Sequence, residues 1–175
     1  MIPSLQELAE QFARMLGTES PLSAAHVPEA TGTQSPVLAP PQALGPVQIV
    51  DYAVKGFHLD VSVQPDQVFS AAQLLDRRGF ALDAITGVDW MAREQMEVVY
   101  DYFHPRANFR VAVRSRIPRG NPEIPSIHEV FPGANWHERE THEFFGIRFL
   151  GHPNLTPLLL PEDANYHPLR KDFVV

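Results

Sequence analysis

Residues 96–114 read MEVVYDYFHPRANFRVAVR, and this stretch predicts the element around which the fold is organised. Apolar side chains dominate from Met96 to Phe103, and a turn-forming His-Pro-Arg-Ala sequence follows them. From Phe109 onward, apolar residues alternate with Arg110 and Arg114, which is typical of a strand with one face on a core and the other in water. The two segments therefore predict a β-hairpin with one buried face.

A strand, a helix and a further strand are predicted upstream of the hairpin. Residues 57–63 read FHLDVSV, and this strict alternation of apolar and polar residues indicates a half-buried strand. Pro65 opens a helical pattern that has basic residues in its last turn and Gly79 as its stop. Residues 80–88 then predict another strand. The order of these elements predicts an α+β fold in which helices pack on one face of a mixed β-sheet.

Two short helices are predicted after the hairpin from capping-box patterns, in which a polar residue precedes a glutamate by three positions. Ser126 with Glu129 marks the first helix, and Asn135 with Glu138 marks the second. The second helix is expected to end at the stop residue Gly146.

The chain is predicted to divide into four parts. Ser4 with Glu7 forms a third capping box, and apolar residues at helical spacing follow it. The parts are an amphipathic helix over residues 1–16, a Pro/Ala-rich tether over 17–46, an α+β domain over 47–147 and an extended docking tail over 148–175. The leading helix is expected either to fray or to pack its apolar stripe on a partner chain.

The composition of the 175 residues excludes several kinds of chemistry. The sequence has no cysteine, so disulfides, thiolate nucleophiles and cysteine-ligated metal clusters are excluded in this chain. Its net charge of -7, without a Lys/Arg stripe, argues against binding to nucleic acid. No secretory signal is visible, and no segment approaches the roughly 20 apolar residues that span a bilayer. We therefore expect a cytosolic chain without a cofactor or a membrane anchor of its own.

Residues 136–147 read WHERETHEFFGI and raise the possibility of a metal site. His137-Glu138 with His142 is superficially similar to the helix of zinc proteases. On a helix of about 100° per residue, histidines five positions apart point roughly 140° away from each other. One metal ion cannot bind both of them, so this pattern argues against a zinc site.

The same stretch also contains a pair of carboxylates. Glu140 and Glu143 lie on one helix face, where such pairs sometimes act in acid–base catalysis. Arg139 is placed at i,i+4 to Glu143, and this spacing favours a neutralised ion-pair cluster. We expect a structural or interfacial helix, with a free-standing metal-dependent hydrolase as a distant alternative.

The tail beyond this helix contains four prolines and the apolar run Leu158–Leu160. Because proline lacks a backbone donor and resists regular pairing, such a tail needs another surface that satisfies its backbone and buries its leucines. That surface is either the chain's own domain or another protein chain. Leucines followed by the charged residues 170–172 are typical of an interface anchor with a polar rim.

Five short motifs recur in order through this region: residues 136–140, residues 145–147, residues 151–153, Leu155 with Leu158–Pro161, and residues 168–172. Similar residues also occur at Ile85–Asp89, Val98–Tyr100 and Pro125–Ser126. On these motifs, residues 57–173 resemble the 30 kDa subunit family of respiratory complex I, which is also known as the C subunit of NADH-quinone oxidoreductase.

The resemblance implies a hydrophilic peripheral-arm subunit of an ion-translocating oxidoreductase, with no catalytic, cofactor-binding or metal-binding residue of its own. It also implies packing against the large 49 kDa-type catalytic subunit and neighbouring iron–sulfur subunits, on the cytoplasmic side of the membrane. The iron–sulfur clusters, and a flavin or a nickel–iron site, would lie in those partner subunits. The membrane would be reached only through them.

Two departures from the family pattern keep a second branch open. The family usually has Asp at the position of Glu143 and paired arginines at the positions of Thr156 and Pro157. The equivalent subunit of membrane-bound, energy-converting nickel–iron hydrogenases is therefore the alternative. In either branch the resemblance implies the same subunit-interface residues, which are Trp136, Glu138, Arg139, Glu140, Glu143, Phe145, Gly146, His152, Leu155, Leu158, Leu159, Pro168, Leu169, Arg170, Lys171 and Asp172.

Overall fold

The computed structural model describes residues 4–18 and 45–174 of the chain. Most of the tether predicted for residues 17–46 lies outside these residues. The first three residues of the predicted N-terminal helix also lie outside them.

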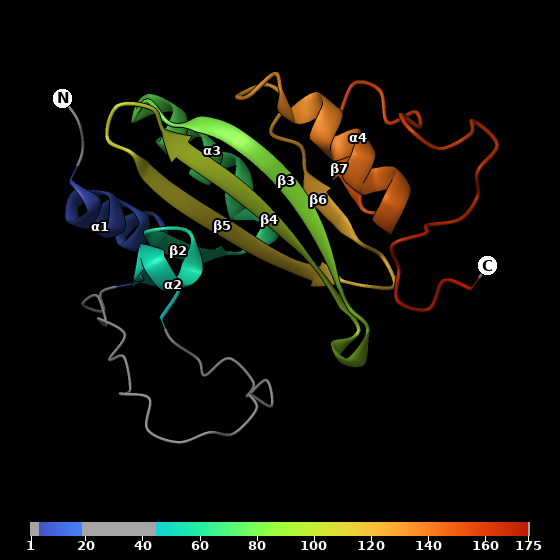
Figure 1. Ribbon diagram of the computed structural model, residues 1–175, viewed down its shortest axis with the longest axis horizontal. Helices are drawn as coiled ribbons and strands as arrows, with labels where there is room; N and C mark the ends of the chain where they lie inside the picture. Colours follow the sequence, from blue (N-terminus) through green and yellow to red (C-terminus); the bar gives the residue numbers. More distant parts are fainter. Residues whose placement is uncertain (1–3, 19–44, 175) are drawn as a thin grey trace.

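A five-stranded mixed sheet forms the centre of the molecule (Figure 1). Its strands, in spatial order, are β1 (Val47–Ile49), β2 (Leu59–Val63), β5 (Phe109–Pro118), β4 (Gln95–His104) and β3 (Ala81–Trp90). Strands β2 and β5 run parallel, whereas the other neighbouring pairs are antiparallel. The predicted α+β class with a mixed sheet is confirmed.

The predicted hairpin is the pair β4 and β5, which starts from the partners His104 and Phe109. Val111 and Val113 are buried, as the alternation predicts, because they lie on the face of the sheet that the helices cover. The opposite face is polar: Arg110 pairs with Asp101 at 2.9 Å, and other arginines and carboxylates pair in the same way. The hairpin therefore separates the core from a polar sheet surface.

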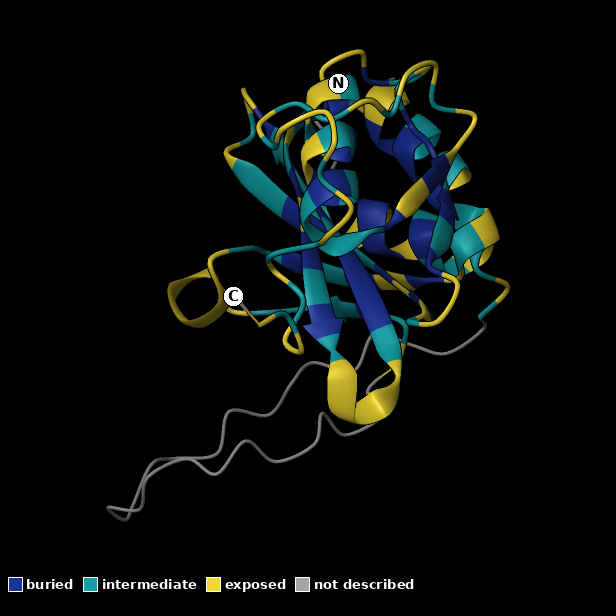
Figure 2. Ribbon diagram, turned by 90° about the vertical axis from the view of Figure 1, so that its right-hand side faces the viewer, coloured by how far each residue is buried: buried dark blue, intermediate teal, exposed yellow. Residues whose placement is uncertain are grey.

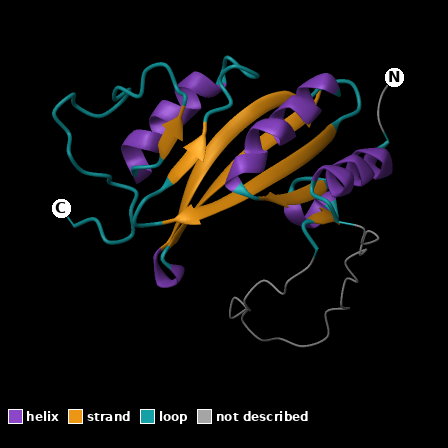
Figure 3. Ribbon diagram, turned by 180° about the vertical axis from the view of Figure 1, so that it is seen from behind, coloured by secondary structure: helices purple, strands orange, loops and turns teal. Residues whose placement is uncertain are grey.

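Helices pack on the covered face of the sheet, as Figure 3 shows from behind. Helix α3 (Val68–Arg77) follows a 3₁₀ turn at Pro65–Gln67 and buries Val68, Ala71, Ala72 and Leu75. Helix α4 (Ala134–Phe145) packs over β3. A short helix, α2 (Tyr52–Lys55), lies between β1 and β2 in the chain and has no buried residue.

Helix α1 (Leu5–Met15) packs on the chain's own sheet. The predicted capping box is present, because Ser4 Oγ accepts from Glu7 N while the Glu7 carboxylate accepts from Ser4 N. Leu8 and Phe12 are fully buried in the main core beside β1 and β2. The prediction that this stripe frays or packs on a partner is wrong, because strands of the same chain supply the apolar surface.

The two capping boxes predicted after the hairpin are wrong. Residues 128–130 form a turn instead of a helix, and the hydroxyl of Ser126 interacts with Glu138, not with Glu129. Helix α4 begins at Ala134 without a side-chain cap. The helix stop is confirmed, since Gly146 has a left-handed φ of 76°.

A small parallel sheet joins the domain to the beginning of the tail. It consists of β6 (Glu123–Pro125) and β7 (Arg148–Leu150). In the described part of the chain, no helix has both the length and the apolar character needed to cross a membrane.

Candidate functional site

Helix α4 and the tail lie side by side at one end of the molecule (Figure 1). Beyond Leu150, the described tail contains turns but no helix or strand. Its backbone therefore needs hydrogen-bond partners outside regular secondary structure. Three anchors from the domain supply them, and together with residues 151–173 they make up what we call the tail clasp.

The first anchor is the carboxylate of Glu143, which is buried on α4. It accepts hydrogen bonds from the backbone N–H groups of Leu158, Leu159 and Leu160, at 2.8 to 3.1 Å. Successive N–H groups that converge on one carboxylate form charge-assisted hydrogen bonds, which are among the stronger ones in proteins. Glu143 therefore orders the leucine run.

Arg139 supports the same segment from the neighbouring turn of α4. Its guanidinium donates to the carbonyls of Thr156 and Pro157, both at 2.9 Å, and lies 5.2 Å from the ring centroid of Trp136. The predicted ion-pair cluster of Arg139 with the glutamates of its helix is wrong. The helical spacing permits that pairing, but the Glu143 carboxylate is committed to tail amides and the arginine to tail carbonyls.

The second anchor is the C-terminal end of α4. The last carbonyls of a helix lack partners within the helix. Here the tail provides them: His167 Nδ1 donates to Glu143 O at 2.8 Å, Leu169 N to Phe144 O at 3.1 Å, and Arg170 Nε to Phe145 O at 2.7 Å. The tail therefore acts as the cap of this helix.

Glycines make room for this packing on both sides of the helix end. At Gly146, an added Cβ would lie 2.6 Å from His167 Nε2 and would also overlap the Arg170 guanidinium. At Gly87 on β3, an added Cβ would lie 2.6 Å from the ring of Phe145. Both positions need hydrogen as a side chain, because the helix, the strand and the tail approach one another closely there.

The third anchor is Asp89, near the end of β3, whose side chain faces inward. Arg119 donates to both of its carboxylate oxygens, at 2.9 and 3.0 Å, and Lys171 N donates to it at 2.9 Å. The paired guanidinium holds the pKa of Asp89 below its usual value, and the Lys171 amide adds to that effect. Arg119 also pairs with Asp172, so the final charged run of the tail is fixed to the domain.

A buried polar cluster lies beneath the base of the tail. Glu138 has no exposed surface and accepts hydrogen bonds from Ser126 Oγ and, at 2.8 Å, from Ile127 N. Burial raises its pKa to about 7, although both hydrogen bonds oppose the change. His152 Nε2 lies 4.0 Å from the carboxylate, but burial lowers the pKa of this histidine, so the two groups do not form an ion pair at neutral pH.

The geometry gives no support to a hydrolase. His128 Nδ1 lies 2.9 Å from Ser126 Oγ, an arrangement superficially like a nucleophile with its base. However, Ser126 and Glu138 are buried, which denies a substrate access to them. Across residues 4–18 and 45–174, no three His, Asp or Glu side chains come together as a possible metal site.

Large apolar side chains remain exposed around the clasp. Trp136 on α4 is 57% exposed, Leu159 is 64% exposed and Leu169 is 53% exposed. Leu150 and Tyr166 are also exposed, although the motifs did not single them out. Figure 2 shows how the buried sheet and helices give way to an exposed tail.

The predicted interface residues differ in burial, and several, including Leu155, Leu158 and Pro168, are half-buried. Glu138, Glu143 and the side chain of His152 are buried, and Glu143 positions the tail from within through its hydrogen bonds to the leucine run. Trp136, Leu159 and Leu169 instead present surface to the outside. Contact of any of them with a partner remains a prediction.

The pair of Asp89 and Arg119 was not predicted. A signal for Asp89 was present, because it follows Ile85 and Gly87 at alternate positions of one strand and shares their inward face. A charged residue at a buried strand position needs a partner, but the sequence does not identify Arg119, which lies 30 residues away.

The fold and the clasp define an α+β domain with an anchored C-terminal tail, and known proteins share this region. The family model for "Respiratory-chain NADH dehydrogenase, 30 Kd subunit" matches residues 61–175. The chain is 40% identical over 141 residues to the C subunit of NADH-quinone oxidoreductase from Roseiflexus castenholzii, covering 78% of this chain and 81% of that protein. It is 45% identical over 96 residues to the C subunit of F420H2 dehydrogenase from Methanosarcina mazei, covering 53% of this chain and 59% of that protein. The chain therefore belongs to the 30 kDa subunit family of respiratory-chain NADH dehydrogenase, as the motifs predicted.

Solved structures are similar as well. One is from the membrane-bound sulfane sulfur reductase, an archaeal respiratory membrane complex. It has a TM-score of 0.62 and 27% sequence identity, and the match covers 66% of this chain and 71% of that chain. Another is a trypsin-resistant fragment of Nqo5, with a TM-score of 0.52 and 27% sequence identity; the match covers 59% of this chain and 92% of that chain. Helix α1 precedes the residues that the family model matches.

Proposed function

We propose that this chain is a non-catalytic scaffold subunit of a complex I-type ion-translocating oxidoreductase, and that its tail clasp docks on the large, 49 kDa-type catalytic subunit. The observation that carries the proposal is the exposure of Trp136 on α4 and of Leu159 and Leu169 on a tail whose backbone the domain holds by several hydrogen bonds. Exposed apolar side chains on an ordered surface are typical of a protein interface.

Family membership supports the identity of the partner. The relatives are subunits of an NADH-quinone oxidoreductase and an F420H2 dehydrogenase, and one similar chain comes from a respiratory membrane complex. By analogy, iron–sulfur clusters and a flavin or nickel–iron site would be held by the large subunit and its iron–sulfur neighbours. The chain would sit on the cytoplasmic side of the membrane and reach it only through these partners.

The alternative within this proposal is the equivalent subunit of a membrane-bound nickel–iron hydrogenase. The variety of the relatives, which are named for different electron carriers, keeps this branch open. Purification of the native complex and identification of its large subunit distinguishes the branches. A large subunit with nickel-binding cysteine pairs would select the hydrogenase.

Replacement of Leu159 by serine tests the docking surface, with Val54→Ser as the matched control. Both side chains are strongly exposed, 64% for Leu159 and 70% for Val54, but Val54 lies on α2, away from the tail. Neither change should alter the free energy of unfolding by more than about 0.5 kcal/mol.

We expect Leu159→Ser, combined with Leu169→Ser, to lower the recovery of the large subunit in co-purification by about 30-fold, the effect of a loss of about 2 kcal/mol at an interface hot spot. Val54→Ser should leave recovery unchanged. Equal recovery with the serine pair and the control would refute docking through the tail.

A further inference from the structure

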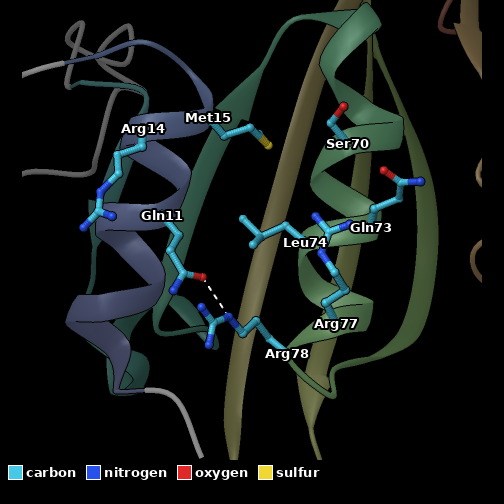
Figure 4. Close-up of a pocket in the computed structure, with 8 residues that line it drawn as sticks. All are labelled: Gln11, Arg14, Met15, Ser70, Gln73, Leu74, Arg77 and Arg78. Atoms are coloured by element: carbon cyan, nitrogen blue, oxygen red, sulfur yellow. Dashed lines mark hydrogen bonds between the residues drawn. The ribbon is translucent and has the colours of Figure 1, made fainter.

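A second surface lies at the other end of the molecule, between α1 and α3. Figure 1 shows α1 far from α4 and the tail. Residues of both helices line a hollow of about 440 Å³ between them (Figure 4). Its volume falls in the range of pockets that hold small ligands.

The lining of this hollow is basic. Its described lining residues include Arg77 at the end of α3, Arg78 directly after it and Arg14 on α1, and none of them is acidic. In Figure 4 the Arg78 side chain reaches across the space between the helices, whereas the Arg14 guanidinium points away from it. Arg78 Nε donates to Gln11 Oε1 at 2.8 Å and so bridges the two helices. Arg14 makes an exposed contact of 3.5 Å with Glu10. In a chain of net charge -7, this local excess of positive charge favours an acidic ligand.

The floor of the hollow is apolar. Leu74 and Met15 pack against the hydrophobic core but still line the hollow, and in Figure 4 both side chains point into the space between the helices. Arginine and methionine are enriched at protein interfaces, and the planar guanidinium fork matches a carboxylate in two parallel hydrogen bonds. The surface therefore combines carboxylate recognition with a place for an aliphatic side chain.

The remaining lining groups distinguish a peptide from a phosphate. Gln11, Gln73 and Ser70 each offer both donors and acceptors. A peptide backbone uses both kinds, whereas the phosphodiester of a lipid headgroup only accepts at neutral pH. The mixture of amides, a hydroxyl, guanidiniums and an apolar floor fits an extended peptide better.

We propose that the hollow between α1 and α3 is a docking site for an acidic, extended peptide segment of a neighbouring subunit. The inference rests on the proposed function only for the source of that segment, and its surface is separate from the tail clasp. Helix α1 precedes the residues matched by the family model, so the site depends on an element that the family match does not include.

The test uses the full chain, labelled with ¹⁵N, and two capped synthetic peptides. One peptide is Glu-Leu-Glu-Leu-Glu, and the other replaces each glutamate with glutamine. We expect the acidic peptide to shift the amide resonances of α1 and α3, with an affinity that falls as salt is added. The amide peptide should bind at least about tenfold more weakly, a difference of about 1.4 kcal/mol.

Charge reversal locates the site. Arg77→Glu should weaken binding of the acidic peptide by about tenfold. The control Arg93→Glu makes the same change in charge at an exposed position of the turn between β3 and β4. It should change the affinity by less than about twofold.

Three results would overturn the proposal. They are equal binding of the two peptides, equal weakening by Arg77→Glu and Arg93→Glu, or perturbation of α1 and α3 by phosphatidylglycerol vesicles but not by the acidic peptide. Leu159→Ser should leave peptide binding intact, so failure of tail docking and failure of this site are distinguishable.

Discussion

Replacing Gly146 with alanine is expected to release the end of the tail from α4. Its φ of 76° is left-handed, where alanine costs about 1 kcal/mol or more. The new Cβ would also lie 2.6 Å from His167 Nε2 and would overlap the Arg170 guanidinium, so both side chains would have to move. That movement breaks their hydrogen bonds to the carbonyls of Glu143 and Phe145. At about 1 kcal/mol each, the tail loses about 2 kcal/mol, and its open population rises about 30-fold.

Gly56→Ala is the matched control for the backbone strain. Gly56 also has a φ of 76°, but within the described ranges no atom lies within 4 Å of its added Cβ. Amide hydrogen exchange at Leu169, whose N–H donates to Phe144 O, reports on the tail. We expect exchange at Leu169 to be about 30-fold faster in Gly146→Ala and unchanged in Gly56→Ala, while both variants lose about 1 kcal/mol of global stability. Equal protection of Leu169 in the two variants would refute the close packing of the tail on the helix end.

Three further changes test the buried Glu138 cluster and the anchors at Glu143 and Asp89. Because the folded-state pKa of Glu138 is about 7 and its unfolded value is 4.5, the folded chain retains a proton that the unfolded chain releases, so stability falls as pH rises from 4.5 to 7. The free energy of unfolding should fall by about 3 kcal/mol over this range, as measured by urea unfolding. Glu138→Gln should not show this fall. The same pH profile in the variant and the parent chain would contradict the assignment to Glu138. Glu143→Gln should weaken the attachment of the tail to the domain by about 1 to 2 kcal/mol, which hydrogen exchange would show as faster exchange of the leucine-run amides. Glu140→Gln changes no anchor of the tail and should leave this exchange unchanged. Asp89→Asn leaves a buried ion pair broken and should lower the free energy of unfolding by about 3 kcal/mol; an unchanged urea midpoint would exclude the proposed anchor.

Local patterns predicted the hairpin and the helix stop correctly. Alternation along β5 identified its buried face because a half-buried strand has a period of two residues, a property of the strand itself. Gly146 was identified because left-handed backbone strongly favours glycine. Both features follow from residues close together in the sequence.

Features that depend on distant residues were predicted less well. Ser126 and Glu138 each have capping-box spacing to a neighbour, but they interact with each other across 12 residues, because both are buried and need a partner there. Likewise, Arg139 and Glu143 have the spacing of an ion pair, but both side chains form hydrogen bonds with the tail backbone instead. Which of the predicted interface residues are buried could not be read from the sequence for the same reason.

These buried anchors give the proposed docking surface a physical basis. A free tail would lose about 1 to 2 kcal/mol of backbone entropy for each residue that a partner fixes. Here Glu143, Asp89 and the end of α4 already hold the tail, so much of that ordering occurs during folding. On the proposed function, Leu159 and Leu169 then reach the partner on a backbone that is already arranged, and binding retains more of their hydrophobic free energy. Glu143 and Asp89 should thus strengthen docking without touching the large subunit.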